Sequence, residues 1–179
     1  MQSASERTRR GIIRVFTECF ANKWFVMTLC ERLSVRRKIR HSRKSSRDRV
    51  IKDLKEYILS SSEEEATAVL AVIDYEKGRM RPYIDALLNE FLRTEKQRID
   101  NSLVVAYERE RRVVVIVFDP NIEEALLCRA DRRLCRDKDL LRRIKSKRGP
   151  EFLQGRLRNN PYIRSITERV AKTMEELLQ

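Results

Sequence analysis

The pattern of apolar and polar positions changes character at residues 103–118. This stretch is the segment densest in β-branched residues, with apolar runs at 103–107 and 113–118 on either side of the charged residues 108–112. Branching at Cβ weakens helix formation, and both alternating sets of 113–118 are apolar, as in a strand buried on two sides. The pattern favours a β-hairpin, with a single helix left open because short apolar runs are ambiguous.

Apolar positions elsewhere recur at helical spacing. Residues 12–20 and 24–33 carry broad apolar faces, whereas residues 50–58 and 163–177 carry apolar residues three and four positions apart. A broad apolar face is typical of a helix in the centre of a bundle, and a stripe is typical of a helix with one buried side. These four ranges are therefore predicted to be helices.

A capping box marks the clearest helix start. Ser62 as N-cap places Glu65 at the third helical position, and Gly78 provides a C-terminal stop. Pro82, which suits a first helical turn, opens a second apolar stripe that continues to Ile99. The short link between the two stripes predicts an antiparallel helix pair.

The C-terminal third is divided by further helix signals. Asp119 precedes Pro120 and is predicted to cap a helix, which bends or breaks near Asp137. The pairs Gly149-Pro150 and Asn160-Pro161 mark two more breaks, because proline restricts the residue before it. A last helix is expected to dock on the rest of the chain.

These elements predict a mainly α fold, a helical bundle-like single domain over residues 1–179 with a short central antiparallel β-hairpin around residues 103–118. Four Gly and four Pro in 179 residues disfavour an all-β fold with many tight turns. Within this domain, residues 34–49 are expected to form a basic, flexible segment, and residues 150–179 a C-terminal helical segment that docks on the domain.

Charge is distributed unevenly along the chain. The formal charge is +10 over residues 1–60, −5 over 61–128 and +8 over 129–179, which together give +13. Arginine outnumbers lysine by 29 to 11, and its planar fork of donors suits phosphate. The pI near 10 fits a polyanionic partner such as nucleic acid or an anionic membrane surface.

Two basic windows, with neighbouring arginines, are the candidate nucleic-acid contacts. Closely spaced basic side chains neutralise phosphates and release counterions. The candidates are Arg36, Arg37, Lys38, Arg40, Arg43, Lys44, Arg47, Arg129, Arg132, Arg133, Arg136, Arg142, Arg143, Lys145, Lys147, Arg148 and Arg158. The competing interpretation of these residues is a solvated basic surface.

The sequence favours a non-enzymatic nucleic-acid-binding protein that contacts the backbone of a duplex, with RNA favoured over DNA. The alternative is a small regulatory or viral accessory adaptor that binds an acidic protein. A magnesium-dependent nuclease is the third candidate, because Asp74 and Glu76 lie close together and Asp119 follows the hairpin. It ranks last because capping also accounts for these acids.

No cofactor or metal is expected. Four scattered cysteines and one histidine do not match zinc-ligand spacing. We expect the cysteines to be free thiols in a reducing intracellular location, either nucleus or cytoplasm. No transmembrane segment is expected. A homodimer through residues 103–118 or the helix at 162–178 is left open.

Overall fold

The computed structural model describes residues 12–33, 38–41, 47–60, 67–76 and 80–178. Its strands are β1 Ile12–Thr17, β2 Lys38–His41, β3 Thr67–Asp74, β4 Glu95–Asp100, β5 Leu103–Glu108 and β6 Val113–Phe118. Its α-helices are α1 Phe20–Cys30, α2 Arg47–Ser60, α3 Arg81–Ala86, α4 Cys128–Ala130, α5 Arg133–Arg136, α6 Lys138–Lys145, α7 Gly149–Leu157 and α8 Pro161–Leu178. Two π-helical turns are η1 Leu87–Phe91 and η2 Glu123–Leu127.

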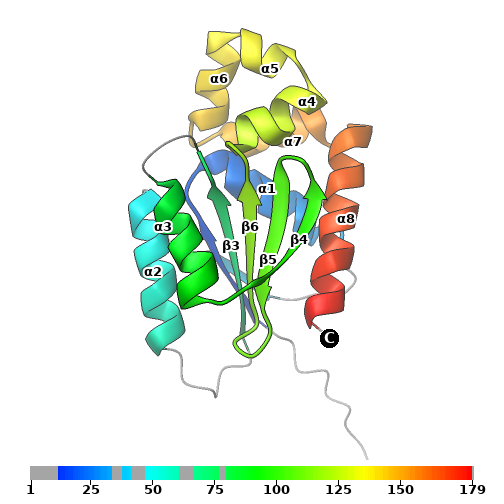
Figure 1. Ribbon diagram of the computed structural model, residues 1–179. Coiled ribbons are helices and arrows are strands. Elements are labelled where there is room, and N and C mark those ends of the chain that lie inside the picture. The colour runs from blue at the N-terminus through cyan, green and yellow to red at the C-terminus, as the bar shows by residue number, and fades with distance from the viewer. Residues whose placement is uncertain (1–11, 34–37, 42–46, 61–66, 77–79, 179) are drawn as a thin grey trace, which may run out of the picture.

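The strands of this described part form one mixed sheet in the order β2-β1-β3-β6-β5-β4. The pairs β1–β2, β1–β3 and β3–β6 are parallel. The pairs β5–β6 and β4–β5 are antiparallel. The carboxyl ends of β1, β3 and β6 therefore share one edge of the sheet, which is uppermost in Figure 1.

Helices cover both faces of the sheet (Figure 1). On one face, α2 and the α3–η1 segment pack on apolar side chains such as Val69, Ala71 and Val115. On the other, α1, α7 and α8 pack on side chains such as Leu70 and Ile116. Burial on both faces is characteristic of a sheet with parallel central strands. The result is a three-layer α/β/α arrangement.

The expected mainly α, bundle-like fold is therefore wrong. Residues 12–17 and 67–74 are the parallel strands β1 and β3, where the pattern predicts helices at 12–20 and 62–78. Residues 68–74 are all buried, so β3 has no polar face and no alternation to distinguish it from a buried helix. The predicted antiparallel pair with the following helix is wrong for the same reason. Ser62, Glu65 and Gly78 lie outside the described residues.

The predicted hairpin is confirmed. β5 and β6 pair in antiparallel register from Leu103 opposite Phe118 to Glu108 opposite Val113. Every residue of β6 is buried, as expected of a strand covered on two sides. The hairpin lies inside the larger sheet, where β3 covers one of its edges and β4 the other. Helices of the same chain cover its two apolar faces.

Several helix predictions are confirmed in part. α2 buries Val50 and Leu54 on the expected face. The helix expected from Pro82 forms but ends at Phe91, and the residues up to Ile99 belong largely to β4. Asp119 does not cap a helix, because its carboxylate accepts hydrogen bonds from the Arg81 guanidinium at 2.9 Å.

The C-terminal helices cover the upper edge and one face of the sheet (Figure 1). Asp137 interrupts the helical path and caps α6 through hydrogen bonds from the Asp139 and Leu140 amides. Asn160 caps α8 in the same way through the amides of Tyr162 and Ile163. α8 then lies against α1, β4 and β5. None of the described helices has the length and apolar character needed to cross a membrane.

Candidate functional site

The chain order of the first strands creates a crevice at the upper edge of the sheet. β1 lies between β2 and β3, so the chain leaves β1 for a neighbour on one side and then crosses to the other side. In open α/β sheets, such a reversal opens a crevice outside the carboxyl ends of the two strands, and ligands bind there. Here Glu18 directly follows β1, and Asp74 is the last residue of β3.

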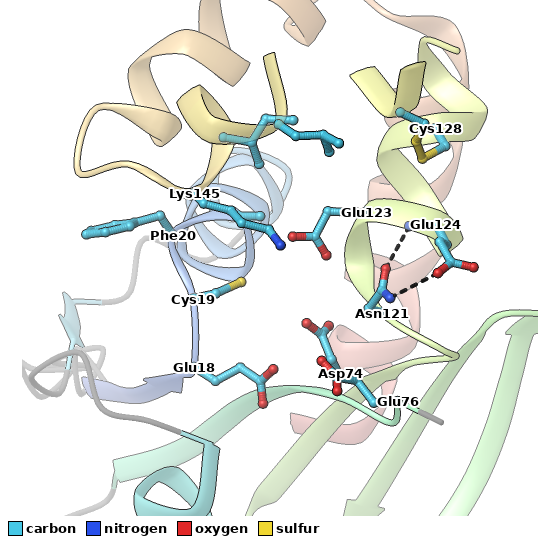
Figure 2. Close-up of a pocket in the computed structure, with 14 residues that line it drawn as sticks. Glu18, Cys19, Phe20, Asp74, Glu76, Asn121, Glu123, Glu124, Cys128 and Lys145 are labelled. Carbon is cyan, nitrogen blue, oxygen red and sulfur yellow. Dashed lines mark hydrogen bonds between the residues drawn. A yellow bond between two sulfur atoms is a disulfide. The ribbon is translucent and has the colours of Figure 1, made fainter. Parts of the chain in front are cut away.

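A pocket of about 530 Å³ lies at this crevice. Figure 2 shows side chains from the ends of β1 and β3, from η2 and from α6 pointing into it. Its lining is strongly acidic, with five carboxylates and one ammonium group. The charged lining residues are Glu18, Asp74, Glu76, Glu123, Glu124 and Lys145. An acidic pocket is unexpected in a chain with a formal charge of +13.

Glu18 and Asp74 are buried carboxyl groups. Glu18 is 8% exposed and Asp74 is 4% exposed. The Ile122 amide donates a hydrogen bond of 3.0 Å to Oδ1 of Asp74 and fixes its orientation. Burial, together with the charges of Glu18 and Glu123 and a hydrogen bond with Glu18, raises the pKa of Asp74 well above its usual range. The two carboxyl groups thus repel each other unless a proton or a cation lies between them.

Local structure fixes the start of α1 beside this pair. The Cys19 side chain caps α1 by accepting a hydrogen bond of 3.4 Å from the Asn22 amide. The buried Asn22 side chain donates to the carbonyl of Val72, also at 3.4 Å. The start of α1 is therefore tied to β3. Glu18 has little freedom to move away from Asp74.

Glu123 and Lys145 complete the pocket from the side opposite β1 and β3. Glu123 opens η2, and Lys145 is the last residue of α6. In Figure 2 the Lys145 amine and the Glu123 carboxylate point toward each other across the pocket. Glu124 instead points toward Asn121. The side-chain amide of Asn121 donates a hydrogen bond of 3.3 Å to the Glu124 carboxylate, and its oxygen accepts one of 2.9 Å from the Glu124 backbone amide. Glu124 is thus held by its own helix start.

The pocket cysteines lack the lowered pKa of an activated nucleophile. Burial and the nearby Asp74 carboxyl raise the pKa of Cys19 to about 12, so its thiol remains protonated near neutral pH. Cys128 and Cys135 form a disulfide, which corrects the expectation of four free thiols. Cys19 and Cys30 are free, as expected.

The arrangement is suited to a cation that brings its own additional ligands. No group of three His, Cys, Asp or Glu side chains in the described ranges is close enough to form a complete metal cage. Magnesium does not require one, since it keeps several waters and binds through one or two carboxylates together with substrate phosphates. The Glu18–Asp74 pair meets that smaller requirement.

Part of the first predicted basic window is described. Lys38 and Arg40 belong to β2, which pairs with β1 at the edge of the sheet, and Arg47 begins α2. The remaining candidates of that window lie outside the described residues; they are Arg36, Arg37, Arg43 and Lys44.

The second basic window lies near the pocket. The candidates from Arg132 to Arg148 belong to α5, α6 and the turns beside them, at the same end of the sheet as the acids (Figure 1). Arg129 is engaged in the fold instead, with its guanidinium 3.5 Å from the Asp100 carboxylate and hydrogen-bonded to Ser102. Arg158 follows α7 and is exposed.

The acids of the third sequence hypothesis separate in the structure. Asp74 and Glu76 line the pocket, whereas Asp119 pairs with Arg81. The sequence pattern did not single out Glu18 or Glu123. A signal for Glu18 is present in the sequence, because it directly follows the run at 12–17, but the apolar pattern of 12–20 predicts a helix there. Glu123 carried no comparable signal, since acids in a first helical turn are common.

Comparison with known proteins adds no relative. No family model, curated protein or solved structure matches the chain.

Proposed function

We propose that this protein hydrolyses phosphodiester bonds of nucleic acid with a divalent cation bound at Glu18 and Asp74. The observation that carries the proposal is the pair of buried, mutually repelling carboxyl groups at the crevice between β1 and β3. Buried acids of like charge cost stability unless they are neutralised, and a hard divalent cation neutralises both. Crevices of this kind are the usual ligand sites of open α/β sheets.

The pocket residues have distinct roles in this proposal. A divalent cation would polarise the phosphoryl oxygen and lower the pKa of a bound water. Glu18 and Asp74 would hold that cation, and the Glu123 carboxylate would accept the proton of the attacking water. Lys145 neutralises charge that develops on the phosphate. The oxygen of water forms a bond to phosphorus, the ester bond to the leaving sugar oxygen breaks, and that oxygen takes a proton from solvent.

Nucleic acid is the proposed substrate because the pocket is set in a basic protein. The chain carries 40 basic and 27 acidic residues, and residues 129–179 alone have a charge of +8. Such a balance attracts the phosphate backbone and accelerates association through long-range electrostatics. The acidic pocket requires the cation before a phosphate can approach it.

Non-enzymatic binding of nucleic acid is the second candidate. The same exposed arginines support it, and it requires no role for the buried acids. An acidic protein partner would use the same basic surfaces. Metal-dependent turnover separates the proposal from both, because neither binding function depends on Glu18 and Asp74.

The test is hydrolysis of bis(p-nitrophenyl) phosphate and of labelled RNA and DNA with Mg²⁺, Mn²⁺ or EDTA. We expect metal-dependent cleavage by the wild type and a loss on the order of a hundredfold or more in Glu18→Gln and Asp74→Asn. Glu124→Gln is the matched control, since Glu124 lines the same pocket but is held by Asn121. Cleavage that persists in EDTA or in both acid variants would contradict the proposal.

A further inference from the structure

The α5–α6 lobe, defined as residues 132–148, is the most basic surface of the described chain. It carries nine basic side chains and two acidic ones, Asp137 and Asp139. Leu134 and Ile144 point inward and are fully buried, whereas every basic residue of the lobe is exposed. The exposed basic residues are Arg132, Arg133, Arg136, Lys138, Arg142, Arg143, Lys145, Lys147 and Arg148.

The fold accounts for only some of these charges. Arg142 lies 3.5 Å from Asp139, but both side chains are more than 80% exposed, so the pair stabilises the fold little. The dipole of α6 favours cations in its last turn, which covers Arg142, Arg143 and Lys145. Within the described part of the chain, Arg132, Arg136 and Lys147 take part in no ion pair. Mutual repulsion among such charges is relieved by an anionic partner.

Another exposed helix shows the more usual arrangement. On α2, basic and acidic residues alternate along the solvent side, and Arg49 and Lys52 lie within 4 Å of Asp53 and Glu56 one turn later. Interspersed charges of this kind need no ligand. The excess of positive charge is therefore specific to the α5–α6 lobe and is not shared by the exposed side of α2.

The lobe also forms a wall of the acidic pocket. Cys135 from α5 and Leu141, Ile144 and Lys145 from α6 line the pocket. Figure 1 places α5 and α6 beyond the carboxyl ends of the strands, and Figure 2 shows Lys145 reaching from α6 into the pocket. A second groove on the lobe is lined by Arg133, Arg136, Asp137, Lys138 and Leu140, together with Arg156 of α7, which pairs with Asp131. A polyanion bound along the lobe would therefore lie next to Glu18 and Asp74.

We propose that the α5–α6 lobe binds the sugar-phosphate backbone of a polynucleotide and presents one phosphate to the acidic pocket. The presentation of a phosphate for cleavage rests on the proposed function. The binding of the backbone rests on the charge of the lobe alone. The acids supply the site of chemistry and repel the backbone, whereas the lobe supplies the attraction that holds the strand there.

The experiment measures binding separately from cleavage. Fluorescence anisotropy in EDTA, over a series of salt concentrations, follows a labelled oligonucleotide in single-stranded and in duplex form. The lobe variant is Arg132→Gln with Arg136→Gln and Lys147→Gln. The matched control neutralises as many exposed cations elsewhere, through Lys52→Gln, Arg98→Gln and Lys172→Gln. Hydrolysis of bis(p-nitrophenyl) phosphate, which is too small to span the lobe, is measured on all three proteins.

We expect the wild type and the control to bind at least one form of the oligonucleotide. The lobe variant should bind more weakly, with a slope of log affinity against log salt that is flatter by about two to three, since each lost phosphate contact contributes about 0.7 to 0.9. Its hydrolysis of the small diester should equal that of the wild type. Equal binding by the lobe variant and the wild type, or equal loss in the control, would overturn the inference. Binding that depends on the lobe, without any metal-dependent hydrolysis, would support the inferred binding of the backbone and contradict the proposed function.

Discussion

The carboxyl groups of Glu18 and Asp74 share a hydrogen bond at the ends of two neighbouring parallel strands. The two residues come from segments separated by α1, β2 and α2, and only the strand order brings them together. A pair of buried acids is costly for stability and useful for binding a cation. Stability of the metal-free protein and stabilisation by added cation measure these two consequences separately.

In metal-free protein, Asp74→Asn should raise the free energy of unfolding at neutral pH. The folded pKa of Asp74 lies above its usual value of 3.8, so the stability provided by its protonated form is fully present below that value. This stability is lost as the pH rises through the raised folded pKa. Asparagine has no proton to lose, and it keeps an oxygen for the Ile122 amide. Urea unfolding in EDTA at a series of pH values measures the effect.

The control for this measurement is Asp139→Asn, an exposed acid on α6 whose replacement should change stability by less than about 0.5 kcal/mol. The wild type should lose stability with rising pH in the window above 3.8, relative to Asp74→Asn. A variant less stable than wild type at neutral pH would show that the charge repulsion at the pocket is not costly.

Divalent cations should stabilise the wild-type fold. A ligand that binds only the native state adds about 2.7 kcal/mol at a concentration one hundred times its Kd. Differential scanning fluorimetry with Mg²⁺ or Mn²⁺ should therefore show a rising Tm in the wild type and in Glu124→Gln. Glu18→Gln and Asp74→Asn should show little or no shift. An equal shift in all four proteins would place the cation elsewhere.

Replacing Lys145 should affect turnover more than metal binding. Lys145→Met removes the ammonium group that reaches into the pocket, and we expect kcat for bis(p-nitrophenyl) phosphate to fall about tenfold to a hundredfold. The metal-dependent rise in Tm should remain. Lys147→Met is the control, because Lys147 is exposed two residues after the end of α6 and does not line the pocket. Equal kcat values in the two variants would remove Lys145 from the proposed chemistry.

Two glycines of α7 should respond differently to alanine. A Cβ at Gly149 would lie 2.1 Å from the carbonyl oxygen of Ile144, so Gly149→Ala should destabilise the fold by about 1 to 3 kcal/mol. A Cβ at Gly155 meets nothing within 4 Å, and alanine there should stabilise the helix by about 0.5 to 1 kcal/mol. Thermal unfolding of the two variants tests how closely α6 approaches α7. A neutral Gly149→Ala would contradict this close approach.

The hairpin and the α/β fold differ in how much of their structure is local. β5 and β6 are joined by a short turn, so the two β-branched runs that form the pair are adjacent in the sequence. β3 pairs instead with β1 and β6, and its burial on both faces removes the alternation that marks a strand. Parallel strands buried on two sides carry this ambiguity in any single sequence.

The sequence predicts only parts of the candidate site. Its pattern identifies Asp74 and Glu76 as paired acids, and the basic residues of the α5–α6 lobe other than Lys138 as contacts for phosphate. It does not identify Glu18 and Glu123, because acids near helix starts or ends are common and usually serve capping. Whether these acids lie beside Asp74 depends on which strand ends are neighbours, and the order of strands in the sheet decides that.

By itself, the sequence determined the strongly basic surface, the hairpin at 103–118 and the buried face of α2. Charge, β-branching and helical periodicity each depend only on residues that are close together in the sequence. Only the tertiary structure decided that residues 12–17 and 67–74 are strands and that their ends meet. Hydrogen bonds between distant segments and cover from helices on both faces select the strand conformation there. That choice brings Glu18 to Asp74 and the α5–α6 lobe to the edge of their pocket.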